Sequence, residues 1–290
     1  MTSHLPATLG ARLRRRVRDV IRPYPDRAAL NDRRMLHLRP FGMFSNVCEV
    51  VQHLHNAARD RYTFDIQWAN SPYRDPAVGA EPWTYYFRQP FPPPVAPLDD
   101  RPVLPGGRDV VCRSDNIITP CRVDFDHHSM YLPADTAPAH RIISRFLHLT
   151  PATKAAVEAA AAQLLQGPTL GVHMRGPSGT DGGNRDARAR HGSSDKVPYA
   201  LFQRHIDTAL ASRPAARILL CSDDADVIDR MRAHYGDRIV TFDAFRLPAG
   251  EMHTRIARGE TMETTPYRLG LDVVIEAYLL ARTDLLIHDY

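Results

Sequence analysis

The sequence contains little cysteine and no long apolar stretch. Its four cysteines are scattered, and no two form a Cys-x-x-Cys pair. A chain of 290 residues also needs no disulfide framework to fold. No apolar run approaches the roughly 20 residues of a membrane helix, and the first residues lack the apolar segment of a signal peptide. We therefore expect a cytoplasmic protein that neither spans a membrane nor is exported by means of a signal peptide.

A basic surface spread over the whole chain is missing too. The formal net charge is +4, but the first forty residues alone hold ten arginines and three aspartates, so the remainder is slightly acidic. Nucleic-acid binding needs positive charge spread across the fold, and we expect no nucleic-acid partner. The arginines from Arg12 to Arg22 surround a short apolar stripe, which predicts a basic helix in a leader of residues 1–34. This helix either makes weak contact with an anionic membrane surface or is a solvated leader.

With 43% hydrophobic and 24% charged residues, the chain has a soluble globular composition and is long enough for two domains. In residues 35–137, a strand from Met35 runs into a glycine turn, followed by a helix over 47–59 and a strand over 62–68. The prolines within 90–108 exclude a helix or central strand there. Residues 138–167 predict connecting helices, one of them with Thr150 as N-cap and Pro151 at the first helical position.

Residues 168–290 alternate strands and helices, which predicts a doubly wound parallel sheet. The strands are expected at 170–174, 217–221, 238–242 and 284–288, and the helices at 197–212, 225–235 and 269–281. Ligands of such sheets bind beyond the carboxyl ends of the strands. The candidates for function are therefore the residues that follow the strands: His173, Arg175, Ser222, Asp223, Asp224, Asp243 and His288.

Arg175 is the candidate with the most specific chemical role. A planar guanidinium at a strand end can bind two phosphate oxygens at once. His173 is either a second group of the same site or a buried strand histidine that bonds to the backbone. Asp223 or Asp224 either binds the base or ribose of a nucleotide or caps the helix that follows.

Four motifs occur in the order in which one known family carries them: VHMRG at 172–176, DKVPY at 195–199, LCSDD at 220–224 and IEAYLLAR at 275–282. In order and spacing they resemble the donor-binding half of α1,6-fucosyltransferases, including the bacterial nodulation type. The resemblance implies a GT-B-like α/β fold, with two Rossmann-type domains built on parallel sheets. It also implies GDP-fucose as the donor, inversion at the anomeric carbon, and no metal or other cofactor.

Carried over to this sequence, the resemblance implies catalytic roles for Arg175, as the contact to the diphosphate, and for His173. Glu276 falls where the family has an acidic donor-binding residue. It stands among apolar residues, so burial without a partner would be costly, and a ribose, a base amide or an arginine would explain it. The residues expected to bind the donor are Ser222, Asp223, Asp224, Glu276, Lys196 and His191.

The N-terminal half is similar, more distantly, to related bacterial glycosyltransferases through FGMFSN at 41–46 and through residues 65–76. A glycine-and-asparagine turn faces the cleft in those enzymes. The resulting candidates for the acceptor site or cleft are Gly42, Asn46, Asn70 and Tyr73. Aromatic residues nearby either stack on a sugar or form core: Trp68, Tyr73, Trp83, Tyr85 and Tyr86.

Two features depart from the family pattern. A glycine-rich loop over 177–194 replaces a compact one, and is either a mobile lid over the donor or a disordered insertion. The sequence stops at Tyr290, where relatives continue with a serine-rich loop for the donor phosphate. The chain is thus either truncated or a divergent enzyme without part of the usual donor site.

Three functions stay open. The first is an inverting glycosyltransferase in which Arg175 neutralises the leaving diphosphate and a carboxylate takes the acceptor proton. The second is an inactive nucleotide-sugar-binding protein of the same fold. The third is a metal-dependent hydrolase built on DFDHH at 124–128, a spacing without fixed ligand geometry. The candidates for the general base are Asp75, Asp181, Asp186 and Asp195.

The sequence does not identify the acceptor of such a transferase. A glycan, a lipid-linked sugar, a peptide and a small natural product all fit. Fucose itself is the expectation from the family, because a fold can take another nucleoside diphosphate sugar after changes in one or two loops.

Overall fold

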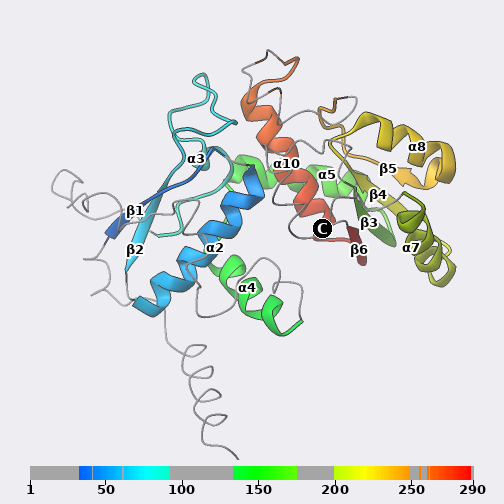
Figure 1. Cartoon of the computed structure of the whole chain (residues 1–290), viewed down its shortest axis with the longest axis horizontal. Coiled ribbons are helices and arrows are strands. Elements are labelled where there is room, and N and C mark those ends of the chain that lie inside the picture. Colours follow the sequence, from blue (N-terminus) through cyan, green and yellow to red (C-terminus); the bar gives the residue numbers. More distant parts are fainter. Residues whose placement is uncertain are drawn as a thin grey trace, which may run out of the picture. The chain divides into compact units, whose positions relative to one another are not determined.

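The computed structural model describes residues 33–40, 42–60, 62–91, 133–174, 199–247, 255, 260 and 262–288. The chain divides into two compact units (Figure 1). The N-terminal unit comprises Met1–Ser71 and Gly79–Thr150, and the C-terminal unit comprises Pro72–Val78 and Pro151–Tyr290. Each unit contains a parallel sheet, which confirms the predicted α/β class.

The N-terminal unit opens with a strand–helix–strand motif, as predicted. Strands β1 (Arg33–His37) and β2 (Thr63–Gln67) pair in parallel, and α2 (Met43–Asp60) connects them. This helix starts four residues earlier than the sequence indicated, because Met43 continues its apolar stripe and is 1% exposed. Two further helices in this unit are α3 (Trp83–Tyr86) and α4 (Pro133–Phe146).

The C-terminal unit contains a four-stranded parallel sheet in the order β5-β4-β3-β6. The predicted alternation is confirmed, with β5 shorter than expected. The strands are β3 (Thr169–His173), β4 (Arg217–Cys221), β5 (Ile239–Val240) and β6 (Leu285–His288). The helices are α5 (Pro151–Leu164), α7 (Tyr199–Ser212), α8 (Ala225–Tyr235) and α10 (Pro266–Leu280), and a 3-10 turn, η5 (Gly236–Arg238), precedes β5.

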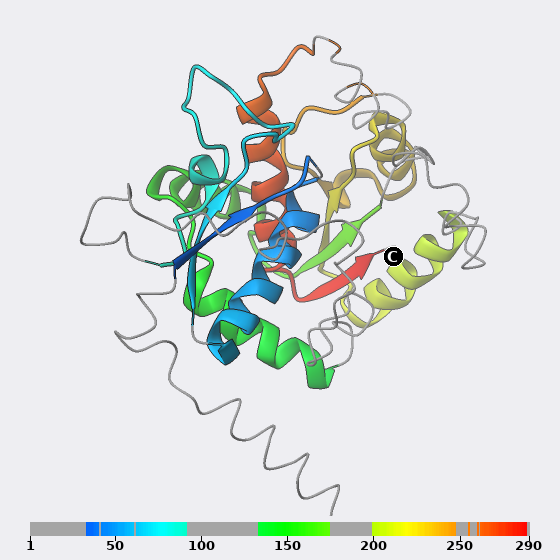
Figure 2. The ribbon, with the colours of Figure 1, turned by 60° about the vertical axis from the view of Figure 1, so that its left-hand side comes forward.

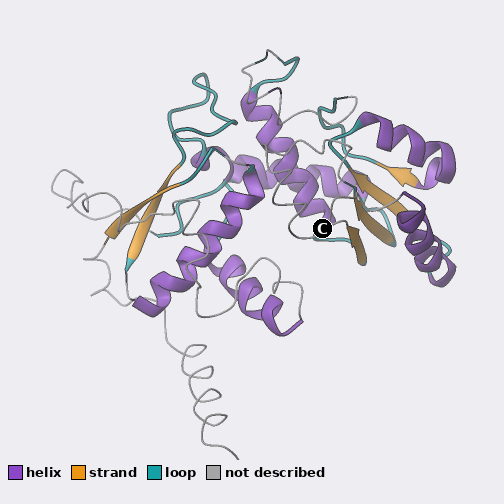
Figure 3. Ribbon diagram, viewed as in Figure 1, coloured by secondary structure: helices purple, strands orange, loops and turns teal. Residues whose placement is uncertain are grey.

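Helices cover both faces of this sheet (Figures 2 and 3). Val172 and Leu220 point to the face covered by α7 and α8, where they pack with Phe202 and Ile206. Helices α5 and α10 lie on the other face, and a Cβ added to Gly171 would come within 2.5 Å of Oγ1 of Thr283, just after α10. Because both faces are covered, the central strands are continuous apolar runs and not alternating ones.

Helix α5 begins at Pro151, as the sequence predicted for its N-terminus. The sequence grouped α4 and α5 together as connecting helices, whereas the structure places α4 in the N-terminal unit and α5 in the C-terminal unit. Both guanidinium Nη atoms of Arg282 donate to the carboxylate of Glu158, at 2.9 and 2.7 Å, and so join the end of α10 to α5. This bidentate pair helps to explain why α5 belongs with the C-terminal unit.

Several predicted segments lie outside the described residues. They are the basic helix from Arg12 to Arg22, nearly all of the proline-rich segment 90–108, the motif at 124–128 and the loop at 177–194. Within the described ranges, no helix combines the length and the apolar character that crossing a membrane requires.

Candidate functional site

The carboxyl edge of the C-terminal sheet has a topological switch point. From β3 the chain continues to β4 and β5 on one side, and it returns to place β6 on the other side of β3. Ligands of open parallel sheets bind beyond the strand ends at such a point. The last residue of β3, half-buried His173, stands opposite Cys221 on β4 and His288 on β6. The structure therefore places His173 at the centre of the edge where a ligand is expected.

The turn after β4 carries three of the predicted residues. Asp224 is completely buried, and its Oδ1 accepts from the backbone N–H of Asp226, so it caps α8. Oγ of buried Ser222 accepts from the backbone N–H of Asp224 at 3.1 Å. Of the two roles that the sequence left open for the aspartates, Asp224 thus has at least the capping one. Asp223, half-buried between them, is the member of the turn that can face a ligand.

Glu276 of α10 is the acidic residue that the sequence expected to need a partner. Its Oε1 accepts from Nη2 of Arg246 at 2.6 Å, and the two side chains are only 16% and 12% exposed. Burial raises the pKa of Glu276 to about 7; Arg246 opposes that rise, while the nearby carboxylates of Asp272 and Asp223 add to it. An arginine was one of the three partners that the sequence allowed, and here it is the one present.

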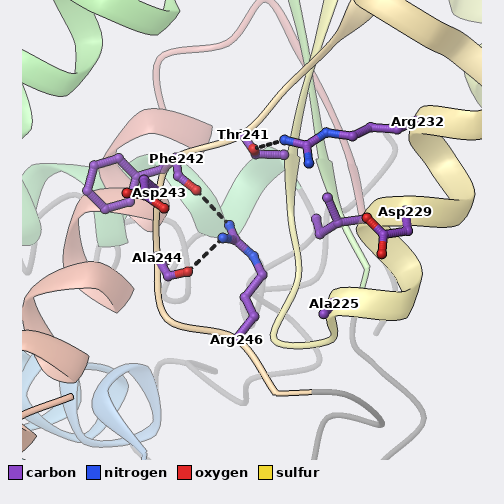
Figure 4. Close-up of a pocket in the computed structure, with 9 residues that line it drawn as sticks. Ala225, Asp229, Arg232, Thr241, Phe242, Asp243, Ala244 and Arg246 are labelled. Atoms are coloured by element: carbon purple, nitrogen blue, oxygen red, sulfur yellow. Dashed lines mark hydrogen bonds between the residues drawn. The ribbon is translucent and has the colours of Figure 1, made fainter. Parts of the chain in front are cut away.

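Arg246 itself was not among the sequence candidates. Besides Glu276, its guanidinium donates to three backbone carbonyls. Those of Ala244 at 2.8 Å and Phe242 at 2.9 Å are drawn in Figure 4, and the third is that of Ser222 at 3.0 Å. One side chain thus joins the turn after β4, the segment after β5 and helix α10. The only signal in the sequence is indirect: a glutamate in an apolar helix implies a cation elsewhere in the chain.

A pocket of about 480 Å³ lies beside Arg246, between α8 and the segment after β5 (Figure 4). This volume is within the range of small-ligand sites. Nη2 of Arg232 donates to Oγ1 of Thr241 across it at 2.8 Å. The polar side chains in the lining include both signs of charge: Asp229, Arg232, Thr241, Asp243 and Arg246. We call this the edge pocket.

Cys221 lies at the end of β4, next to this cluster. Burial, together with the nearby carboxylate of Glu276, raises the pKa of its thiol well above the ordinary value. The thiol is therefore protonated near neutral pH, and a nucleophilic role for it is not indicated.

The four candidates in the N-terminal half have different environments. Asn46 is completely buried: its Oδ1 accepts from the N–H of Arg39, and its Nδ2 donates to the carbonyls of Arg39 and Gly42. Its amide therefore fixes the turn between β1 and α2. Asn70 is exposed in a turn, and Tyr73 is buried and belongs to the C-terminal unit.

The aromatic cluster of the N-terminal half forms core. Trp68 and Trp83 are 0% and 1% exposed. Their indole N–H groups donate to the carbonyls of Arg39 at 2.7 Å and Arg88 at 3.2 Å. Trp83 also stacks on Phe87, with ring centroids 4.7 Å apart. Of the two interpretations open from sequence, the structure supports core packing for these indoles and not sugar stacking.

Several predicted site residues lie outside the described part of the chain: Arg175, Lys196, His191, Asp181, Asp186 and Asp195. Asp75, the remaining general-base candidate, lies in the C-terminal unit, and its Oδ1 accepts from the N–H of Ala77. Across the described ranges, no group of three or more His, Cys, Asp or Glu residues is arranged to hold a metal ion.

No protein-family model and no curated protein matches this chain. Solved fucosyltransferases are similar to it in structure. A NodZ α-1,6-fucosyltransferase co-crystallised with GDP has 18% sequence identity and a TM-score of 0.47, with 89% of this chain and 88% of that chain covered. NodZ from Bradyrhizobium has 17% identity and a TM-score of 0.47, with 88% of each chain covered. A mutant of Arabidopsis thaliana FUT1 in complex with GDP has 11% identity and a TM-score of 0.48, with 98% of this chain and 70% of that chain covered.

Proposed function

We propose that this protein is an inverting, metal-independent glycosyltransferase that transfers a sugar, fucose, from a GDP-sugar to an acceptor. The observation that carries the proposal is the carboxyl edge of the C-terminal sheet. There His173, Asp223 and Glu276 come from separate elements, His173 marking the switch point and Asp223 close enough to Glu276 to raise its pKa. The position is where nucleotide-binding sheets hold their ligand. The motifs that carry these residues are the ones that resemble fucosyltransferases.

The proposed chemistry breaks the bond between the anomeric carbon and the β-phosphate oxygen, and the electron pair stays on the leaving GDP. Arg175, two residues after His173, is assigned to the developing negative charge on that phosphate. A fixed guanidinium there stabilises the transition state more than the ground state, because the charge grows as the bond breaks.

The acceptor oxygen attacks the opposite face of the sugar, so the configuration inverts. Its proton passes to a carboxylate, for which Asp75, Asp181, Asp186 and Asp195 are the candidates. Inversion and independence of a metal come from the motif resemblance. The acceptor is proposed only as a class, a hydroxyl-bearing glycan, peptide or small molecule.

Thermal stabilisation by nucleotides tests this function. GDP and GDP-fucose, added without metal, are expected to raise the Tm of the full chain, while UDP and ADP leave it unchanged. A ligand at about 100 times its Kd stabilises by about 2.7 kcal/mol, which corresponds to a shift of a few degrees for a chain of this size. Stabilisation by GDP-fucose without transfer or hydrolysis would instead indicate the inactive binding protein. Absence of stabilisation by any of the four would contradict a nucleotide site altogether.

A further inference from the structure

Residues 241–247, which follow β5, have no regular structure and are held by polar contacts to three other elements. Arg246 contributes the bonds to Ser222 and Glu276 described above. The N–H of Phe245 donates to Oδ2 of Asp272 on α10 at 3.2 Å, and the carbonyl of Leu247 accepts from the N–H of Ala225 at 3.3 Å. We call residues 241–247 the edge segment, because they form one wall of the edge pocket.

Arg246 is the central contact of this segment. Its Nε, Nη1 and Nη2 atoms all donate, and their acceptors belong to the turn after β4, to the edge segment itself and to α10. Only a planar guanidinium has donors that diverge in this way, whereas a lysine ammonium is a compact charge at one point. Arg246 is therefore the side chain that joins the edge segment both to the turn that carries Asp223 and to Glu276.

We propose that Arg246 is a positioning residue of the nucleotide site, which joins the edge segment to Ser222 and Glu276 in the geometry that binds a nucleoside diphosphate. The proposal rests on the proposed function. It assigns to Arg246 no contact with the reacting atoms. Arg246 acts through the two groups it holds, the backbone of the turn before Asp223 and the carboxylate of Glu276.

The charged groups around Glu276 make the free energy of unfolding depend on pH in a way that can test the proposal. The edge segment presents Arg246 to Glu276, the turn after β4 presents Asp223, β4 presents Cys221, and α10 itself presents Asp272. Among the groups of the described ranges that shift the pKa of Glu276, Arg246 is the cation. Because the pKa of Glu276 in the folded chain, about 7, lies above its ordinary value of 4.5, folding takes up a proton there. The stability that protonated Glu276 contributes is fully present below about pH 4.5 and is lost as the pH rises through about 7.

The first measurement is GDP binding by calorimetry at pH 7.5. Arg246→Lys keeps a positive charge but cannot reach all the acceptors, and we expect it to weaken GDP binding at least about tenfold, the loss of one charge-assisted hydrogen-bonded contact. Arg282→Gln is the control: it removes another arginine–glutamate pair of the same unit, an exposed one at the end of α10 and far from the edge segment in sequence. The control is expected to bind GDP within twofold of wild type.

The second measurement needs no nucleotide. In Arg246→Gln, Glu276 loses its cation, so its folded-state pKa rises further and the loss of stability extends to higher pH. The difference in unfolding free energy between wild type and Arg246→Gln should therefore widen from pH 5 to pH 8. It should stay constant when both chains also carry Glu276→Gln. Amide hydrogen exchange at residues 243–247 should become faster in Arg246→Lys, with the protection of β3 and β4 unchanged.

GDP binding by Arg246→Lys within twofold of wild type would overturn the proposal, as would unchanged exchange in the edge segment. Failure of the wild-type chain to bind GDP has a different meaning, because it removes the proposed function. In that case two results would still establish that Arg246 holds the edge segment, without a nucleotide role. They are faster amide exchange in Arg246→Lys and a difference in unfolding free energy between wild type and Arg246→Gln that grows with pH.

Discussion

Replacement of Arg175 by alanine is expected to lower the rate of sugar transfer from GDP-fucose by about 10²–10³-fold, the usual cost of removing one preorganised group at a developing oxyanion. In the proposed reaction the leaving group is a diphosphate, and its negative charge rises as its bond to the sugar breaks. In the sequence Arg175 comes two residues after His173, the last residue of β3, and the carboxyl end of β3 lies at the switch point of the sheet. Loss of its guanidinium therefore affects the transition state more than the bound donor.

Kinetics with GDP-fucose and an accepted sugar, or with water as the acceptor, would measure this effect. The value of kcat should fall more than KM rises, because the contact strengthens only as charge develops. Arg204→Ala removes an exposed arginine of α7 in the same unit and serves as the control. An Arg175→Ala chain that turns over within threefold of wild type would remove Arg175 from the mechanism.

Truncation of Trp68 to alanine is expected to lower the free energy of unfolding by about 3–5 kcal/mol, as for other buried tryptophans. The side chain is completely buried, and its indole N–H satisfies the carbonyl of Arg39, which would lose that partner. Denaturant unfolding measures the loss, with Val78→Ala, at a position that is 47% exposed, as the control.

Trp68→Phe is the milder change, since it keeps an aromatic ring at the site but removes the N–H donor together with part of the indole. We expect a smaller loss, about 1–3 kcal/mol for a buried carbonyl left without a partner. A change below about 1 kcal/mol in the alanine variant would favour the alternative interpretation, in which Trp68 stands free to stack on a sugar.

The C-terminal sheet could be predicted from sequence because its strands are covered on both faces. Ile218 to Cys221 reads as one apolar run, and Asp224 marks the start of α8 as a helix cap, so β4 and α8 begin and end where expected. The strand at β5 was predicted too long because Thr241 and Phe242 have β-forming side chains but no partner strand. Pairing is a tertiary property, and a single strand's sequence does not contain it.

Candidate site residues could be selected from sequence where they lie at a strand end or in a recognisable motif. His173 and the turn after β4 were selected by their places at strand ends, and Glu276 by the motif resemblance. Arg246 could not be found in this way, since five residues separate it from the end of β5 and its acceptors are mainly backbone carbonyls, which no motif records. Asn46 was selected as part of a cleft-facing turn, because the bonds of its amide to the backbone of Arg39 and Gly42 cannot be read from the sequence.

Hydrogen exchange of the wild-type chain, with and without saturating GDP, would locate the bound nucleotide. We expect GDP to slow exchange at the carboxyl ends of β3 and β4, in residues 222–225 and 241–247, and around Glu276. Slower exchange confined to other parts of the chain, or no change at saturating GDP, would contradict the assignment of a nucleotide-sugar site to this edge of the sheet.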